Sequence, residues 1–131
     1  MQTIYSHCIS VSFLIQYSMK KITSLFYETA NANKPVREWL LTLTKEDRKI
    51  IGDDIKTVEF GWPIGMPVCR RLESKLYEVR SDISDKRIVR VIFTVINEYM
   101  ILLNGFVKKS QKTPKSEIDL ALKRKKEIKW N

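Results

Sequence analysis

The spacing of hydrophobic residues changes along the chain, and the changes predict both strands and helices. Residues 21–27 combine β-branched and aromatic side chains over the length of one strand. Residues 35–43 carry apolar positions at helical spacing after Pro35, which suits a first helical turn. A second apolar helical face follows up to residue 60, from a Thr-x-x-Asp start to a Gly/Pro stop. The short connection between the two predicts an antiparallel helical hairpin.

The second half of the chain changes to a strand pattern. Residues 70–73, 76–80, 87–96 and 99–107 are alternating or β-prone and are separated by short connections. Consecutive strands of this kind predict an antiparallel meander. A Thr-Pro pair at positions 113–114 then predicts a capped helix near the C-terminal end.

The predicted order of elements is β-α-α-β-β-β-β-α, which defines an α+β fold. We expect a curved antiparallel sheet of about four strands, with the N-terminal helical hairpin on one face and a C-terminal helix after it. The opposite, concave face would be free to hold a ligand.

The first residues fit this order poorly. Residues 9–17 are apolar but lack the features of a signal peptide, and they are far short of the roughly 20 residues that span a bilayer. Met19, followed by two lysines, resembles a fresh start of the polypeptide. We therefore expect residues 1–18 to be an extension outside the fold and residues 19–131 to form the domain. The alternative is that the apolar segment packs as an added strand or helix.

The charge of the chain is high and uneven. Its 131 residues carry a formal net charge of +9. Residues 1–65 hold eight basic and seven acidic side chains, whereas residues 66–131 hold sixteen and eight. The excess points to a polyanionic partner that binds mainly the second half, although moderate basicity can also serve solubility alone.

Several kinds of chemistry are excluded by the residues present. The chain has two cysteines, Cys8 and Cys69, and one histidine, His7, which cannot form a usual zinc site. We expect both thiols to be free, a cytoplasmic location and no membrane association. The sequence has no glycine-rich phosphate loop and no GxSxG nucleophile motif. We accordingly expect no metal and no cofactor.

The remaining candidates for chemistry are basic side chains on the later strands. Arg80 ends one strand, and Arg90 lies within a very apolar strand, where a charge needs a partner or solvent. Arg90 could line an anion site, or it could face solvent and pair with Glu78. Lys108, Lys109, Lys112 and Lys115 follow the last strand and are either a solvated run or a positioned basic edge. Tyr77 and Phe106 could stack on bases or belong to the core.

Three segments resemble the RelE/HigB superfamily of toxin–antitoxin endoribonucleases, in particular its phage-derived HigB-like branch. They are RLESKLYEVR at 71–80, RVIFTV at 90–95 and LLNGFVKKSQKTPKSEIDLALKR at 102–124. With the helical hairpin before them, the resemblance covers about residues 20–128. It implies a RelE-like fold.

The resemblance also implies a function and partners. Such proteins are toxins of type II toxin–antitoxin systems that inhibit translation by cutting mRNA on the ribosome, without a metal. The implied partners are the ribosome, mRNA and a cognate antitoxin, often of the helix-turn-helix type, through which alone the toxin would contact operator DNA. The alternative is a relative with weak or no catalysis that binds nucleic acid or the antitoxin in operon autoregulation.

The resemblance carries over to individual residues. Arginines can stabilise the charge of a phosphorane, and a lysine among other cations can titrate nearer neutrality. The predicted catalytic residues are Arg80, Arg90, Lys108, Lys109 and Glu78, the last of which could instead form a salt bridge. RNA or ribosome contacts are predicted for Arg71, Tyr77, Gln111, Lys112 and Lys115. Asn104 stands where histidine is frequent in the family, and Ser110 where threonine is usual, so a candidate proton carrier is missing.

Overall fold

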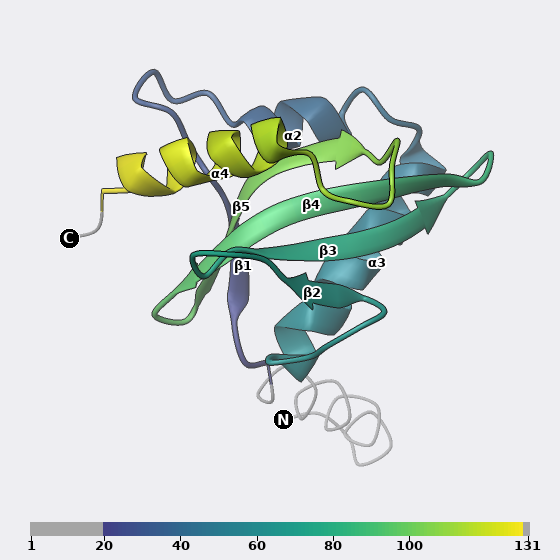
Figure 1. Cartoon of the computed structure of the whole chain (residues 1–131), viewed down its shortest axis with the longest axis horizontal. Coiled ribbons are helices and arrows are strands. Elements are labelled where there is room, and N and C mark those ends of the chain that lie inside the picture. Colours follow the sequence, from purple (N-terminus) through teal and green to yellow (C-terminus); the bar gives the residue numbers. More distant parts are fainter. Residues whose placement is uncertain (1–19, 130–131) are drawn as a thin grey trace, which may run out of the picture.

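Five strands form one sheet in the computed structural model, which describes residues 20–129 (Figure 1). The sheet order is β1-β5-β4-β3-β2. In chain order the elements are β1 (Thr23–Phe26), α2 (Pro35–Leu40), α3 (Lys45–Gly61), β2 (Cys69–Arg71), β3 (Tyr77–Ile83), β4 (Arg87–Ile96), β5 (Tyr99–Val107) and α4 (Lys115–Glu127). The predicted α+β fold and the antiparallel β2–β5 meander are confirmed. The sheet gains a fifth strand because β1 pairs with β5, and this pairing is parallel.

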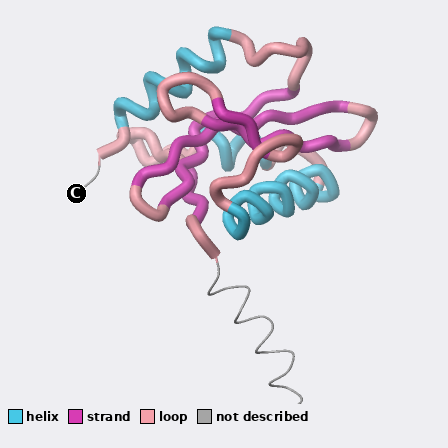
Figure 2. Tube along the Cα trace, turned by 60° about the horizontal axis from the view of Figure 1, so that its bottom comes forward, coloured by secondary structure: helices cyan, strands magenta, loops and turns pink. Residues whose placement is uncertain are grey.

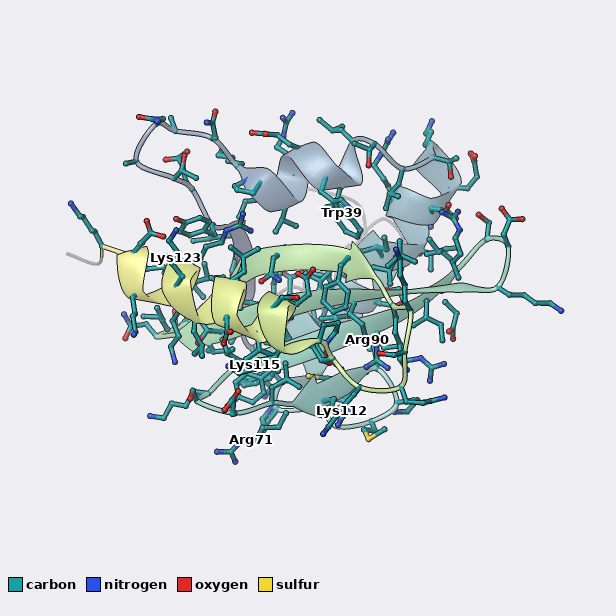
Figure 3. The ribbon with its side chains drawn as sticks, turned by 45° about the horizontal axis from the view of Figure 1, so that its top comes forward. Trp39, Arg71, Arg90, Lys112, Lys115 and Lys123 are labelled. Atoms are coloured by element: carbon teal, nitrogen blue, oxygen red, sulfur yellow. The ribbon has the colours of Figure 1, made fainter. Side chains whose placement is uncertain are left out.

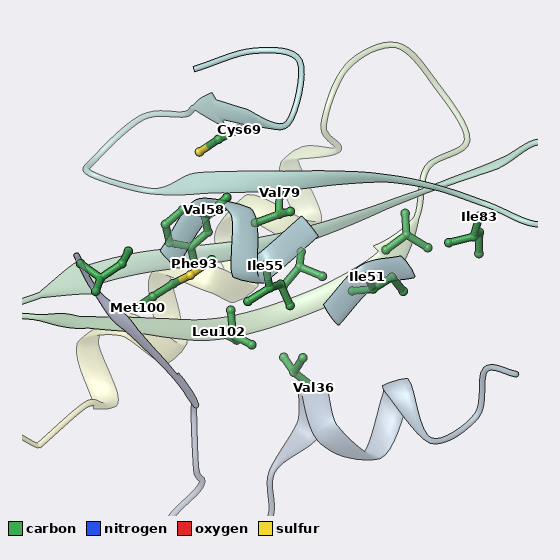
Figure 4. Close-up of a cluster of buried hydrophobic side chains, with 13 residues drawn as sticks. Val36, Ile51, Ile55, Val58, Cys69, Val79, Ile83, Phe93, Met100 and Leu102 are labelled. Carbon is green, nitrogen blue, oxygen red and sulfur yellow. The ribbon is translucent and has the colours of Figure 1, made fainter. Parts of the chain in front are cut away.

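The sheet lies between helices on its two faces (Figure 2). Helices α2 and α3 cover one face, and the core beneath them contains Val36, Ile55, Val79, Phe93 and Leu102 (Figure 4). Alternate residues of the strands point away from this core, as expected for a pleated sheet. The same alternation therefore places Glu78, Arg80 and Arg90 on the opposite face.

Helix α4 covers part of that opposite face, which corrects the expectation that it would be free. The helix packs against β5 and β4, and Ala121 joins a second core with Leu76, Ile92 and Leu103. Strand β5 carries one extra residue here, because Ile92 faces Asn104 while Phe93 faces Leu102. This bulge directs both Leu103 and Asn104 towards α4.

The predicted helical hairpin is present but spread across the sheet. Helix α2 packs on β5, whereas α3 packs on β3, and the two axes diverge (Figure 1). The Thr44 hydroxyl accepts a hydrogen bond from the Asp47 N–H at 3.1 Å, which confirms the predicted cap of α3. The Asp47 carboxylate also contacts the β3–β4 turn, where it accepts hydrogen bonds from Ser84 and Arg87 at 3.0 Å.

The start of α4 differs from the prediction. Pro114 occupies the N-cap position, and no side chain caps this helix. The Thr113 hydroxyl, predicted to cap α4, donates instead to Oε2 of Glu78 at 2.6 Å. The pattern Thr-Pro indicated the helix start correctly, but Thr113 lies one residue before the N-cap position, and its side chain is directed to the carboxylate on β3.

The proposed extension, residues 1–18, and Cys8 lie outside the described residues.

The thiol of Cys69 is free, as expected, and it is buried. Burial, with a further contribution from Glu78, raises the pKa of its thiol to about 11.

Candidate active site

Four basic side chains from four different segments gather on the α4 face of the sheet. They are Arg70 of β2, Arg80 of β3, Arg90 of β4 and Lys108, the residue that follows β5, and we call them the cationic cluster. The register brings them together, because Arg80 lies opposite Arg90 and Arg70 lies opposite Glu78. The Lys108 N–H donates to the carbonyl of Ile88 at 2.7 Å, which fixes the lysine beside the start of β4.

A buried carboxylate lies beneath the cluster. Glu78 has no exposed surface, and its Oε1 accepts an ionic hydrogen bond from Nη1 of Arg90, which is itself 7% exposed. Its Oε2 accepts from Thr113. Both oxygens of Glu78 are therefore engaged. This is the salt bridge that the sequence left open as an alternative to a catalytic base.

Arg80 provides the more accessible guanidinium. Its side chain is 35% exposed, and Nη2 donates to the exposed Asp82 at 3.3 Å. The buried Nε–H groups of Arg80 and Arg90 have no acceptor among the described residues. An anion would therefore meet the exposed part of the Arg80 side chain, and a planar guanidinium suits phosphate oxygens.

The electrostatic environment of Lys108 shows that these cationic side chains lie close together. Desolvation lowers the pKa of its ammonium, and repulsion by Arg90, Arg80 and Arg70 lowers it further, while Glu78 acts in the opposite direction. Each of the three arginines therefore lies near enough to influence the lysine. A lysine with a lowered pKa exchanges protons more readily at physiological pH than an ordinary one.

Other predicted residues surround this cluster. Lys109, Gln111 and Lys112 are exposed in the connection from β5 to α4. Figure 3 shows Arg90 beneath this connection. Lys115 lies in the first turn of α4, where its Nζ is 3.2 Å from Asp119.

Two predicted residues lie elsewhere. Arg71 and Tyr77 are opposite each other on β2 and β3 and line a pocket of about 360 Å³ with Trp62. The Tyr77 ring contacts Trp62 and Phe93, with centroid distances of 4.8 and 5.5 Å. The structure does not bring these two side chains to the cationic cluster. Their role in RNA or ribosome binding stays a prediction.

Sequence reasoning missed two residues of the site. Arg70 and Arg71 are both arginines on a three-residue strand, and only the pairing of Arg70 with Glu78 shows which one faces the cluster. Thr113 was interpreted as a helix cap, although its hydroxyl serves Glu78. For Arg70 the useful signal was the alternation of residues 76–80, because a neighbour of Glu78 in the sheet must share its face. Thr113 lies in the connection before α4, where no such alternation exists.

The family model described as phage-derived protein Gp49-like (DUF891) matches residues 38–126. The chain belongs to this family. The match extends from within α2 to within the last turn of α4, so it includes the cationic cluster, Glu78 and Thr113. The Gp49-like family is a toxin–antitoxin toxin family of the RelE/HigB type, and membership implies an antitoxin partner. No curated protein matches the chain.

In this Gp49-like chain Asn104, at the position where the resemblance led us to expect a histidine, has a structural role. Asn104 is buried, and its Nδ2 donates to the carbonyl of Glu117 at 3.2 Å and to its Oε1 at 2.8 Å. The side chain therefore connects β5 to the first turn of α4. Its Oδ1 has no hydrogen-bond partner among the described residues.

Two further observations concern what the Gp49-like fold could bind. Within residues 20–129, no group of three or more His, Cys, Asp or Glu side chains is arranged to hold a metal ion. In the same part of the chain, no helix is long and apolar enough to cross a membrane.

Proposed function

We propose that this Gp49-like protein is the toxin of a type II toxin–antitoxin system and acts as a RelE/HigB-type endoribonuclease on mRNA at the ribosome. The observation that carries the proposal is the cationic cluster. Three arginines and a lysine from separate segments converge on one face, where Arg80 is partly exposed and Arg90 is held in place by Glu78. Such preorganised donors suit the charge that develops on a scissile phosphate.

The reaction would be an internal transesterification. The RNA 2′-oxygen attacks the adjacent phosphorus, the bond from phosphorus to the 5′-oxygen breaks, and a cyclic phosphate and a 5′-hydroxyl result. Arg80, Arg70 and Lys108 would contact the phosphate oxygens. Arg90, held by Glu78, would contribute a fixed positive charge behind them.

Proton transfer falls to Lys108 in this scheme. Its lowered pKa increases the neutral fraction, which can accept the 2′-hydroxyl proton, and its ammonium form can protonate the leaving oxygen. Glu78 is a weaker candidate because both of its oxygens are occupied. Lys109, Gln111, Lys112 and Lys115 would contact neighbouring phosphates of mRNA or the ribosome.

The ribosome would supply what the site lacks. In this scheme the cluster supplies charge and a proton carrier, and the chain by itself does little to align the 2′-oxygen with the leaving group. In-line alignment is worth several kcal/mol, and mRNA held in the decoding site would already have it. An antitoxin would neutralise the protein in the cytoplasm and carry any contact with operator DNA.

One observation favours a second candidate, a binding-only relative. Asn104 stands where the resemblance led us to expect a histidine, and the buried Glu78 is fully engaged, so within residues 20–129 the lysines that follow β5 are the candidates left for proton transfer. Such a protein would bind ribosomes or its antitoxin without cleaving RNA.

An assay of labelled mRNA cleavage on purified ribosomes, with the full chain, distinguishes the endoribonuclease from the binding-only relative. We expect cleavage with ribosomes and little with naked RNA, and we expect Arg80→Gln and Lys108→Gln to reduce the rate by about 100-fold. Lys86→Gln, at the exposed β3–β4 turn, is the charge-matched control. Arg90→Ala is less suitable because it leaves Glu78 buried without its counter-charge.

Each outcome supports or contradicts a specific part of the proposal. Full binding to ribosomes without any cleavage would support the binding-only relative. Equal cleavage of naked and ribosome-bound RNA would show that cleavage does not depend on the ribosome. Cleavage rates unchanged in both cluster variants would show that the cationic cluster has no catalytic role.

A further inference from the structure

The connection between β5 and α4 is held to the sheet near both of its ends. We call residues 108–114 the basic loop, since it carries Lys108, Lys109 and Lys112. At its start the Lys108 N–H donates to Ile88. Near its end the Thr113 hydroxyl donates to Glu78. Between these points the lysines at 109 and 112 are exposed and have no such bond to the sheet among those the described residues form.

We propose that Thr113 is a positioning residue that latches the basic loop onto Glu78 and so holds its lysines beside the cationic cluster. The role assigned to those lysines rests on the proposed function. The latch itself is a property of the folded chain and does not depend on RNA.

The chemistry of Glu78 makes this contact strong. A carboxylate with no exposed surface needs a donor for each oxygen, because an unsatisfied buried charge is costly. Arg90 serves Oε1, and Thr113 serves Oε2 at 2.6 Å, a distance typical of a hydroxyl bonded to an ionised acceptor. The loop thus supplies a donor that this oxygen requires, so loop closure and the solvation of Glu78 are coupled.

Helix α4 lacks a side-chain cap because its N-cap residue is Pro114, which has no side-chain acceptor. The hydroxyl of the preceding Thr113 is directed to the buried carboxylate, to which it donates its proton. Glu78, which the sequence suggested as a base, acts in this arrangement as the anchor for both Arg90 and the loop.

Limited trypsin digestion of the full chain tests the latch without any assay of activity. Thr113→Val keeps the shape of the side chain and removes the donor, whereas Thr113→Ser keeps the hydroxyl. We expect cleavage after Lys109 and Lys112 to be about tenfold faster in Thr113→Val than in the natural chain, and within about twofold in Thr113→Ser. Ser116→Ala, an exposed neighbour in α4, is the matched control.

Cleavage after Lys56, within α3, reports global opening in the same digest. Loop cleavage unchanged in Thr113→Val, or equally accelerated at Lys56, would overturn the latch. So would a Thr113→Ser chain that behaves like Thr113→Val. A latch confirmed by digestion in a chain that never cuts RNA would refute the proposed function and leave the latch standing.

In an active chain, kinetics on ribosomes give an independent readout. At a temperature well below unfolding, we expect Thr113→Val to lower kcat/KM by about tenfold and Thr113→Ser to restore it. An unchanged kcat/KM in Thr113→Val would show that the loop position does not matter for catalysis and would overturn the positioning role.

Discussion

Adjacent residues with the same chemistry can have unrelated positions in this protein. Arg70 faces the cationic cluster, whereas Arg71, the next residue, lines a pocket with Trp62 and Tyr77. The alternation of residues 76–80 predicted that Glu78 and Arg80 share a face, whereas the resemblance to the RelE/HigB superfamily suggested Lys108. The sequence could not choose between two arginines on a three-residue strand, since a one-residue shift of register exchanges the faces.

A second residue-scale feature is the Asp47 carboxylate, which joins the start of α3 to the β3–β4 turn. Hydrogen bonds from the Ser84 backbone and side chain, together with Arg87, lower its pKa from the ordinary 3.8 despite the opposing effect of burial. A carboxyl whose pKa is lowered by folding stabilises the native state above the ordinary pKa. That stabilisation is lost as the pH falls through the lowered value.

Asp47→Asn should therefore reduce the unfolding temperature at pH 7 and reduce it progressively less below about pH 4. Thermal unfolding of both chains between pH 7 and pH 2 measures this difference. Asp54→Asn, on the same helix, controls for the loss of one negative charge. A difference between Asp47→Asn and the natural chain that stays constant down to pH 2 would contradict the linkage.

At the scale of elements, the sequence predicted most strands and helices close to their observed limits. Strand β5 spans Tyr99–Val107, as expected from residues 99–107, and β4 agrees equally well. Two features were not predictable from local pattern. The partner of β1 is set by tertiary packing, and the bulge at Leu103 changes the phase of β5 within a continuous apolar run that shows no alternation.

The contact of α2 with β5 depends on a glycine. A Cβ at Gly105 would lie 2.5 and 2.7 Å from Cζ3 and Cε3 of Trp39, closer than side-chain carbons approach each other. Trp39 therefore packs directly on the strand backbone, and Figure 3 shows it on the inner side of α2.

Gly105→Ala should lower the free energy of unfolding by about 1–3 kcal/mol, because the tryptophan must move. Denaturant unfolding followed by circular dichroism measures the change. Gly52→Ala is the matched control: a Cβ there meets nothing within 4 Å, and alanine in a helix should stabilise by up to about 1 kcal/mol. A Gly105→Ala chain with an unchanged free energy of unfolding would show that this packing is loose.

At the scale of the whole molecule, the charge distribution follows the fold. The second half, with sixteen basic and eight acidic residues, supplies four of the five strands and α4. The sequence therefore indicated the half of the chain that contains the cationic cluster, but only the folded sheet brings the basic residues of four segments together. Contacts with phosphates release counterions, so binding should weaken steeply as salt is added.

The salt dependence of single-stranded RNA binding tests this distribution. The slope of log affinity against log salt concentration should fall by about 0.7 in Arg80→Gln, the value for one phosphate contact. Lys86→Gln should leave the slope unchanged, because Lys86 lies in the β3–β4 turn, beyond the last paired residues Ile83 and Arg87, and is not part of the cluster. Equal slopes in all three chains would mean that Arg80 contacts no phosphate.

The buried thiol on β2 has a chemical consequence of its own. Cys69 immediately precedes Arg70, and its side chain points to the core under α3 while the arginine faces the other way. With a pKa near 11, the sulfur stays protonated at neutral pH and is a poor nucleophile. Oxidants and alkylating agents can react with it readily only when this edge of the sheet unfolds, so the strand that presents Arg70 carries an intrinsic reporter of its own local opening.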